Sequence, residues 1–502
     1  MRAATLAALI AAVVVVGVRW GTFVVGGSDS YCYLHQAERW ASGTLQLVEP
    51  LALEAPWPDA ALTFAPVGHR PSPTVPGALV PICAVGLSIA MAPLVWFGGI
   101  SAAFFLVPLF GALLIGATYA VGARYGARIG VASAAIVAST PVFLFQLMQP
   151  MSDVPAAALW MAAVAGVTSA RRRGAMLGGA AAAAAIVMRP NLAPLAIPLG
   201  LFLLLRPERP WGERIGAAAR FAAVGAAGPL CVALIQNALY GSPLSSGYGS
   251  LGPLFEMANI QPNAVRYATW LSHTLTPGWV LAAAAPFLVP GALSRLLLWM
   301  FILNVAGYLP YIVFEDWYFL RFLLPTIPLI VVLSVAVVDS ICRRTWPVTS
   351  RPILGVVAVA MMVFGIREAG DRQVFRLRQL EARFEQAGRY VGDALPQNAI
   401  VITSWQSGSV RFYSGRKTIV WDFVDPAWLD RTIVWVRARG FEPYLLFESR
   451  EEPLFRHRFA GHPIGALDWP PAAEIAGSVR IYRPDDRDRY YRNEPVLTDY
   501  AR

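Results

Sequence analysis

Residues 3–33 read AATLAALIAAVVVVGVRWGTFVVGGSDSYCY, an apolar run of membrane-spanning length followed at once by a polar segment. About 20 apolar residues cross a bilayer as one helix. No small-residue cleavage motif follows this run. We therefore interpret 3–25 as a retained first transmembrane helix and not as a removed signal peptide.

Comparable runs recur along the 502-residue chain, which is 56% hydrophobic and only 14% charged, with a mean hydropathy of +0.52. A soluble protein has roughly a quarter of charged residues, so the composition predicts a polytopic α-helical membrane protein. About eleven transmembrane helices are expected. Their approximate ranges are 3–25, 100–121, 130–148, 154–170, 174–188, 190–205, 216–239, 278–294, 296–314, 321–341 and 351–367.

The charge distribution changes near Arg367 and indicates a domain boundary. The first 367 residues hold 21 arginines and 12 acidic residues, whereas the last 135 hold 20 basic and 19 acidic residues. We predict a transmembrane domain over 1–367 and a soluble α/β domain over 368–502. In the latter, a helix is expected over 375–394, strands over 399–403, 417–421 and 444–447, and a short helix over 426–437.

The positions of the arginines favour one topology. With a cytoplasmic N-terminus and 76–97 as a helix on the outer surface, most of the arginines between the spans fall inside, including the cluster Arg171–Arg173. The external segments are then 26–99, 148–153, 240–277 and the soluble tail. The net charge of +10 comes mostly from arginines that flank the membrane, so we do not expect a nucleic-acid partner.

Polar residues gather on the predicted outer side. Nine of the first 12 acidic residues lie there: Asp29, Glu38, Glu49, Glu54, Asp59, Asp153, Glu256, Glu315 and Asp316. The outer arginines are Arg39, Arg70, Arg189, Arg266 and Arg321. Charged groups next to apolar spans are costly and usually mark a site. Carboxylates can act as general bases and guanidinium groups can hold phosphate.

Each candidate also has a purely structural interpretation. Asp29 and Asp153 each precede a helical run and suit a helix N-cap. Arg189 and Arg321 suit interfacial anchors whose long side chains reach the membrane surface. His69 and Arg70 lie in a proline-rich segment that is typical of a solvated loop.

The four cysteines, Cys32, Cys83, Cys231 and Cys342, form no CxxC motif. We interpret them chiefly as small apolar fillers, with a bridge between Cys32 and Cys83 on the outer side as the less favoured alternative. Histidine is too sparse for a zinc motif, and no metal site is predicted.

The order of these motifs resembles the GT-C class of membrane glycosyltransferases that use polyprenyl-phosphate sugars, a class that includes protein O-mannosyltransferases and aminoarabinose transferases. The resemblance rests on Ser28-Asp29-Ser30-Tyr31, a proline-rich stretch at 71–79, and Met151-Ser152-Asp153-Val154-Pro155. The Arg-Pro-Asn at 189–191 and the Arg-Phe-Leu-Leu-Pro at 321–325 extend it.

The resemblance implies inverting transfer of a sugar from a polyprenyl phosphate to an acceptor hydroxyl, outside the cytoplasmic membrane of a bacterium. Asp29 would be the general base and Asp153 would position it or the acceptor. The donor phosphate would be held by Arg189, Arg321 and, more weakly, Arg70.

Tyr31, Glu38, His69 and Tyr318 are further candidates for lining the substrate cavity. No cofactor is implied, although the outer acids leave a bound divalent cation open. The partners would be the lipid-linked donor, membrane lipids and an acceptor that is a glycan, a lipid or a protein. A transporter or flippase of a lipid-linked sugar and a non-catalytic scaffold for cell-envelope assembly are the alternatives.

Overall fold

The computed structural model describes residues 2–206, 208–249 and 252–501, which separate into two compact units. The helical unit comprises the described parts of Met1–Gly21, Ser101–Ile235 and Gly249–Leu377. The sheet unit comprises Thr22–Ile100, the described residues of Gln236–Tyr248, and the described part of Arg378–Arg502. The first external segment and the tail thus belong to one unit, although almost 300 residues separate them in the chain.

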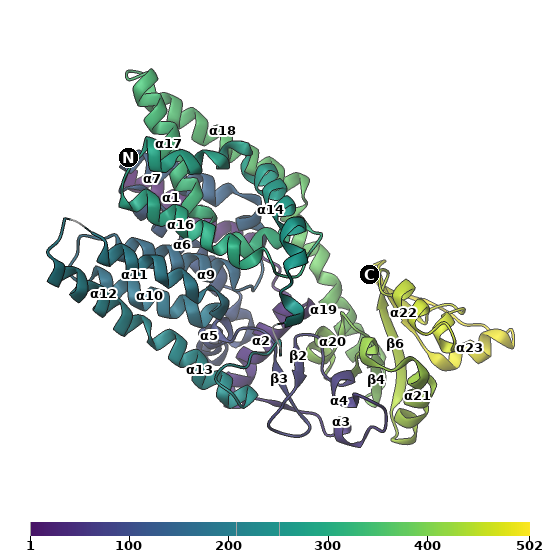
Figure 1. Ribbon diagram of the computed structural model, residues 1–502. Coiled ribbons are helices and arrows are strands. Elements are labelled where there is room, and N and C mark those ends of the chain that lie inside the picture. Colours follow the sequence, from purple (N-terminus) through teal and green to yellow (C-terminus); the bar gives the residue numbers. More distant parts are fainter. Residues whose placement is uncertain (1, 207, 250–251, 502) are drawn as a thin grey trace. The chain divides into compact units, whose positions relative to one another are not determined.

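Helices make up nearly all of the helical unit (Figure 1). In chain order they are α1 (Arg2–Arg19), α6 (Leu106–Gly122), α7 (Ala127–Ser139), α8 (Pro141–Leu147), α9 (Asp153–Val167), α10 (Gly174–Met188), η1 (Pro190–Leu195), α11 (Ala196–Leu204), α12 (Trp211–Gly225), the first part of α13 (Ala227–Tyr240), α14 (Ile260–Leu275), η4 (Pro277–Ala284), α15 (Ala285–Leu288), α16 (Ala292–Tyr308), η5 (Trp317–Leu323), α17 (Ile327–Thr345) and α18 (Ser350–Asp371). Each predicted span overlaps helical residues of this set, although 20–25 of the first predicted span are not helical.

The apolar helices of the protein differ in length. Among the described residues, three helices are long and apolar enough to cross a membrane: Gly86–Ala103, Trp211–Tyr240 and Ser350–Asp371. The number rises to as many as five if each of two bent pairs counts as one span. One such pair, α7 and α8, bends by 64° at Thr140-Pro141, where proline cannot continue the preceding helix. The other apolar helices have 10–17 residues. The total of eleven crossings therefore stays a prediction.

The Ala/Gly-rich helix α10 shows why such a sequence is used in this unit. A methyl group at Gly178 would lie 2.6 Å from Val167 on α9, and one at Gly179 would lie 2.6 Å from the Phe221 carbonyl on α12. Small residues allow helix backbones to approach this closely, which is how helices associate inside membranes.

The sheet unit contains two sheets. A small antiparallel sheet, in the order β1-β3-β2, is formed by β1 (Leu47–Val48), β2 (His69–Pro71) and β3 (Ala78–Pro81). Helix α2 (Gly27–Ala41) precedes it, α3 (Leu51–Glu54) and α4 (Ala60–Thr63) interrupt it, and α5 (Gly86–Ala103) follows. The prediction of a helix over 76–97 was therefore wrong for its first part, since 78–81 pairs as a strand and the helix begins only at Gly86.

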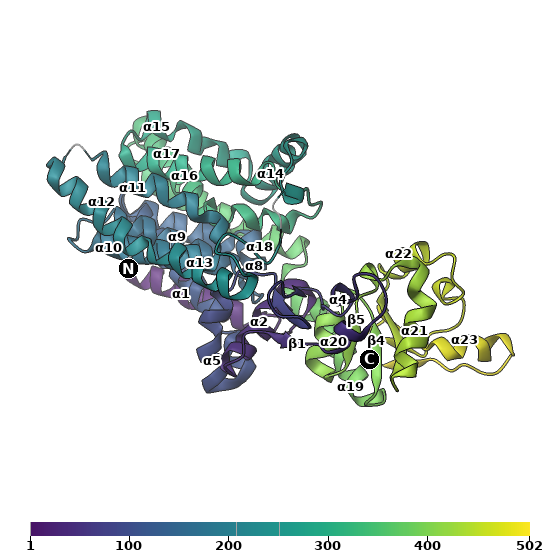
Figure 2. The same ribbon diagram turned by 60° about the horizontal axis from the view of Figure 1, so that its bottom comes forward.

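The larger sheet has the strand order β5-β4-β6-β8-β7-β9. Strands β4 and β5, β4 and β6, and β7 and β9 are parallel, and the other neighbours are antiparallel. The elements are α19 (Leu377–Ala394), β4 (Ala399–Ile402), α20 (Ser407–Ser414), β5 (Lys417–Ile419), α21 (Leu429–Ala438), β6 (Glu442–Glu448), α22 (Glu452–Arg458), β7 (Ala473–Ile475), β8 (Val479–Tyr482), α23 (Pro484–Tyr491) and β9 (Asp499–Ala501). The predicted α/β architecture and all three predicted strands are confirmed. Figure 2 labels β4 and β5, and Figure 1 labels β4 and β6.

Apolar residues cover both faces of this sheet. On one face, α19 and α20 pack through Ala387, Val391 and Val410. On the other, α21 and α22 share a core with Trp57 and Phe64 of the first external segment. The tail therefore completes its core with residues from the segment that follows the first helix, and the chain passes from the helical unit to the sheet unit between Leu377 and Arg378. The division into domains 1–367 and 368–502 stays a prediction.

Candidate functional site

The predicted site residues fall into both compact units. Asp153, Arg189, Tyr318 and Arg321 lie in the helical unit, and Asp29, Tyr31, Glu38, His69 and Arg70 lie in the sheet unit. Each set is described by itself.

In the helical unit, Asp153 and Arg189 form an ion pair. Asp153 is the first residue of α9 and is 1% exposed, and Nη1 of Arg189 donates to its Oδ1 at 2.6 Å. Arg189 ends α10 in an extended conformation because Pro190 disfavours a helical residue before it. The structure thus replaces two sequence interpretations: Ser152 is the N-cap of α9, and Arg189 is largely buried instead of reaching for solvent.

The aromatic ring of Phe322 lies near both Arg189 and Arg321. The Phe322 ring centroid lies 5.8 Å from Cζ of Arg189 and 5.4 Å from Cζ of Arg321. The Tyr308 ring stacks on Phe322 at 4.9 Å, and its hydroxyl accepts a hydrogen bond from Nδ2 of Asn191 at 2.6 Å. We call Asp153, Arg189, Phe322, Arg321 and Tyr308 the arginine–aromatic cluster.

This cluster can hold an anion. Each guanidinium group carries a positive charge and five N–H donors, so it can bind more than one acceptor. Phe322 and Tyr308 were missed as functional candidates, because an aromatic residue near a membrane interface is far more often an anchor. The sequence offered one indication of a polar contact near Arg189, namely Asn191 two residues further on, which binds the Tyr308 hydroxyl.

Tyr318 sits at the edge of this region. Its hydroxyl donates to Oδ2 of Asp316 at 2.7 Å, and its ring stacks on Phe145 with a centroid distance of 5.1 Å. The side chain is partly exposed. A role in lining a cavity stays a prediction.

In the sheet unit, Asp29 lies in the first turn of α2 and is half-buried. The helix begins at Gly27 with Gly26 as its N-cap. Asp29 is therefore not the cap, and its negative charge in the first turn interacts favourably with the helix dipole by about 0.3–1 kcal/mol.

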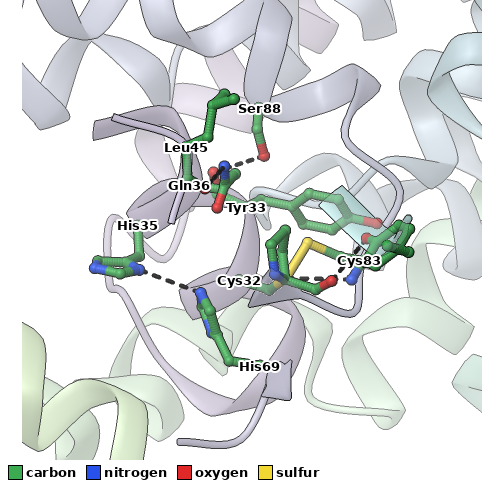
Figure 3. The surroundings of a disulfide bond; sticks show 10 residues. Cys32, Tyr33, His35, Gln36, Leu45, His69, Cys83 and Ser88 are labelled. Carbon is green, nitrogen blue, oxygen red and sulfur yellow. Dashed lines mark hydrogen bonds between the residues drawn. A yellow bond between two sulfur atoms is a disulfide. The ribbon is translucent and has the colours of Figure 1, made fainter. Parts of the chain in front are cut away.

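Tyr31 and His35 of α2 pack against His69 of β2, and Figure 3 shows the two histidines. His35 Nδ1 and His69 Nε2 are 3.3 Å apart, and the Tyr31 ring stacks on His35 with a centroid distance of 5.0 Å. All three are buried, so the solvated-loop interpretation of His69 was wrong. His35 was not singled out, although it follows Tyr31 by four residues and so shares its helix face.

Burial determines the protonation states of Tyr31, His35 and His69 by shifting their pKa values. It lowers the pKa of His35 to about 4, with smaller contributions from the positive charges of Arg39 and Arg411. Burial likewise lowers the pKa of His69 and raises that of Tyr31. Both imidazoles are therefore neutral near pH 7.

This protonation predicts a loss of stability in acid. Between pH 6.5 and 4 the unfolded chain binds a proton at His35 that the folded protein excludes, so stability should fall as the pH drops through this range. The free energy of unfolding should fall by up to about 3 kcal/mol because of His35. Thermal melting of the wild type and His35→Gln across this range measures it. The variant should show the weaker pH dependence, and equal pH dependence would contradict the assignment.

A disulfide joins Cys32 on α2 to Cys83 between β3 and α5 (Figure 3). The interpretation of these two residues as fillers was wrong, and the less favoured alternative, a bridge, is what the structure shows. Local sequence could not reveal it, because 51 positions and three strands separate the two cysteines along the chain. Cys231 and Cys342 are free.

The bridge closes a loop with a sequence separation of 51, which contains the end of α2 and the strands β1, β2 and β3. Because the bridge restricts the unfolded chain, it should raise the free energy of unfolding by about 2–4 kcal/mol. Cys32→Ser/Cys83→Ser should therefore melt at a lower temperature than the wild type, and a reductant should lower the melting temperature of the wild type only. Cys231→Ser is the matched control. If the reductant affects the double variant equally, the bridge is not the cause.

The roles predicted for Arg70 and Glu38 stay predictions. Arg70 on β2 donates to the Gly247 carbonyl at 3.3 Å, and Glu38 is exposed on α2. Within the described residues, His, Cys, Asp and Glu side chains do not gather in threes that would suit a metal ion.

Comparison with known proteins identifies the fold. No protein-family model matches the sequence, and no curated protein matches it. Among solved structures, the chain is similar to ArnT from Cupriavidus metallidurans bound to undecaprenyl phosphate, with 12% identity, a TM-score of 0.55, and coverage of 95% of this chain and 97% of that one.

Two other glycosyltransferases share this fold. The archaeal oligosaccharyltransferase AglB from Archaeoglobus fulgidus, in complex with an inhibitory peptide and a dolichol-phosphate, matches with 11% identity and a TM-score of 0.55 over 92% of this chain and 71% of that one. The arabinofuranosyltransferase AftD from Mycobacteria matches with 16% identity and a TM-score of 0.50 over 98% and 45%. The chain therefore has the GT-C fold, the fold of multi-pass membrane proteins, over most of its length.

Proposed function

We propose that the protein is a glycosyltransferase that moves a sugar from a polyprenyl-phosphate donor to an acceptor hydroxyl at the outer face of the bacterial cytoplasmic membrane. The observation that carries this proposal is the fold, which almost the whole chain shares with a structure bound to undecaprenyl phosphate. The arginine–aromatic cluster adds a chemical reason, since paired guanidinium groups suit a phosphate.

In the proposed reaction, Asp29 accepts the proton of the acceptor hydroxyl while its oxygen attacks the anomeric carbon of the donor sugar. The bond between that carbon and the phosphate oxygen breaks, and the polyprenyl phosphate leaves. This single displacement inverts the anomeric carbon. Arg189 and Arg321 stabilise the charge that develops on the departing phosphate.

The structure supports a different role for Asp153 from the one expected. Its carboxylate binds Arg189 at 2.6 Å, so we assign it to holding the guanidinium in place instead of orienting the acceptor. A charged arginine away from water needs such a partner. Asp153 is therefore a positioning residue for phosphate binding.

Transfer assays with purified protein test this function. The enzyme is incubated with radiolabelled polyprenyl-phosphate mannose, arabinose, glucose or galactosamine, each with a membrane extract as the acceptor source. We expect label to pass from one donor to an acceptor. Movement of an intact donor across a proteoliposome membrane would instead indicate a flippase, and neither transfer nor movement would favour a scaffold.

The proposal includes an external placement of the first loop and the tail. The Cys32–Cys83 disulfide supports it, because disulfides form and persist mainly in oxidising compartments. Reporter fusions after Arg173 should read cytoplasmic, and fusions after Ala394 should read external. A cytoplasmic reading after Ala394 would also remove Asp29 from the proposed reaction.

A further inference from the structure

We propose that helix α20 of the C-terminal part positions the first turn of α2, and with it Asp29. This inference rests on the proposed function, in which Asp29 is the base. It assigns to the tail a role in the reaction, carried by Gly408 and Tyr413. All the contacts that support it lie within the sheet unit.

The local sequence at the start of α2 does not restrict its backbone to one conformation. Helix α2 begins directly after Gly26 at Gly27, and Gly27 has a φ of +58°. Glycine has more conformational freedom than other residues. A general base that follows two glycines needs contacts from elsewhere if it is to keep one position.

The tail supplies contacts before Asp29. The Val25 amide donates to the Tyr413 hydroxyl at 2.8 Å, across 388 residues of sequence. At Gly26 the Phe384 ring is so close that a methyl group would lie 2.6 Å from its Cδ2. Residues four and three positions before Asp29 are thus held by α20 and α19.

The tail also supplies a contact after Asp29. Tyr31 is 1% exposed, and its ring lies against Gly408 of α20 so closely that a methyl group there would be 2.4 Å from Cδ1. Only glycine allows this approach. Asp29 therefore lies between two points of attachment to α20, Val25 on one side and Tyr31 on the other.

Helix α20 is itself firmly placed. Arg411, in its middle, bonds Glu49 at 3.0 Å, the Phe64 carbonyl at 2.8 Å and Thr418 of β5 at 2.7 Å. Glu49 is 2% exposed and also binds Lys417 at 2.7 Å. The large sheet, the first external segment and α20 thus form one scaffold for α2.

Two substitutions test this role in the full chain. Gly408→Ala should displace Tyr31 and lower kcat about tenfold or more, because small displacements of a catalytic group are costly. Tyr413→Phe removes only the hydroxyl acceptor for Val25, should fold normally, and should lower kcat by a smaller factor. Both should leave the donor KM unchanged.

Hydrogen exchange gives a readout independent of activity. Amides of 27–41 should exchange faster in both variants than in the wild type, whereas those of β4 and β6 should not. Phe455→Leu is the control, since it weakens the tail core among Phe447, Trp421 and Phe459, a different core cluster from the one that contains Val410 of α20. It should leave exchange in 27–41 and kcat unchanged.

The results separate this inference from the proposed function. Unchanged exchange in 27–41 for both variants, or an equal effect of Phe455→Leu, would overturn the role of α20. Faster exchange in 27–41 with Asp29→Asn fully active would retain that role and overturn the base assignment. If both proposals hold, Gly408→Ala should lower the rate no further in the Asp29→Asn background.

Discussion

Asp29→Asn is expected to lower turnover by about two orders of magnitude or more while the protein folds and binds its donor normally. Asparagine has nearly the size of aspartate but cannot accept a proton at neutral pH, and general-base catalysis contributes roughly 10²–10⁴-fold. Asp29 sits in the first turn of α2 and is not its N-cap, so the substitution leaves the cap of the helix unchanged. Initial rates with a labelled donor, together with melting temperatures, measure both effects.

Asp59→Asn provides the matched control, because Asp59 is an exposed acid in the same external segment. Its left-handed backbone conformation, with a φ of +54°, is one that asparagine also adopts readily. It should turn over like the wild type. Normal turnover of well-folded Asp29→Asn would exclude Asp29 as the base.

Arg189→Ala is expected to have two effects, a strong loss of donor use and a loss of stability of about 3–5 kcal/mol. The stability loss arises because the buried carboxylate of Asp153 would lose its partner. Arg189→Lys should restore donor use only in part, since an ammonium group lacks the planar pair of donors. Donor KM and melting temperature are the measurements.

A double variant separates the two effects. Asp153→Asn/Arg189→Gln replaces the ion pair with neutral groups that can still hydrogen-bond, so it should recover stability but not donor use. Arg321→Ala should weaken donor use as well. Unchanged donor affinity and turnover in both Arg189→Ala and Arg321→Ala would return these residues to the role of membrane anchors.

The helical part of the fold was predictable because apolar length is a local property. The runs around 106–122 and 350–371 are read directly from the sequence. The strands at 399–402 and 442–448 follow from short apolar segments between helical patterns. The 64° bend at Thr140 was missed, although Pro141 was its visible signal.

The assembly of the sheet unit was not predictable, because it depends on pairing between distant residues. Nothing near Trp57 or Phe64 indicates a core shared with α21 and α22. The Cys32–Cys83 bridge and the contact of His35 with His69 likewise arise from the fold of 47–81.

The candidate site was predictable in its residues but not in its contacts. Asp153 and Arg189 stand out as charges beside apolar spans, yet their pairing across 36 residues comes from the packing of α9 against α10. That pairing changes the role proposed for Asp153. The role of Gly408 could not be predicted, because its close contact is with Tyr31, which is distant in the sequence.

The most direct test of the central claim is the stoichiometry of the reaction. The amount of free polyprenyl phosphate formed is measured against the amount of sugar incorporated into the acceptor, with wild type and Asp29→Asn side by side. The account predicts equimolar amounts in the wild type and loss of both products in the variant. Sugar that crosses the bilayer still attached to its lipid, with no free polyprenyl phosphate formed, would contradict it.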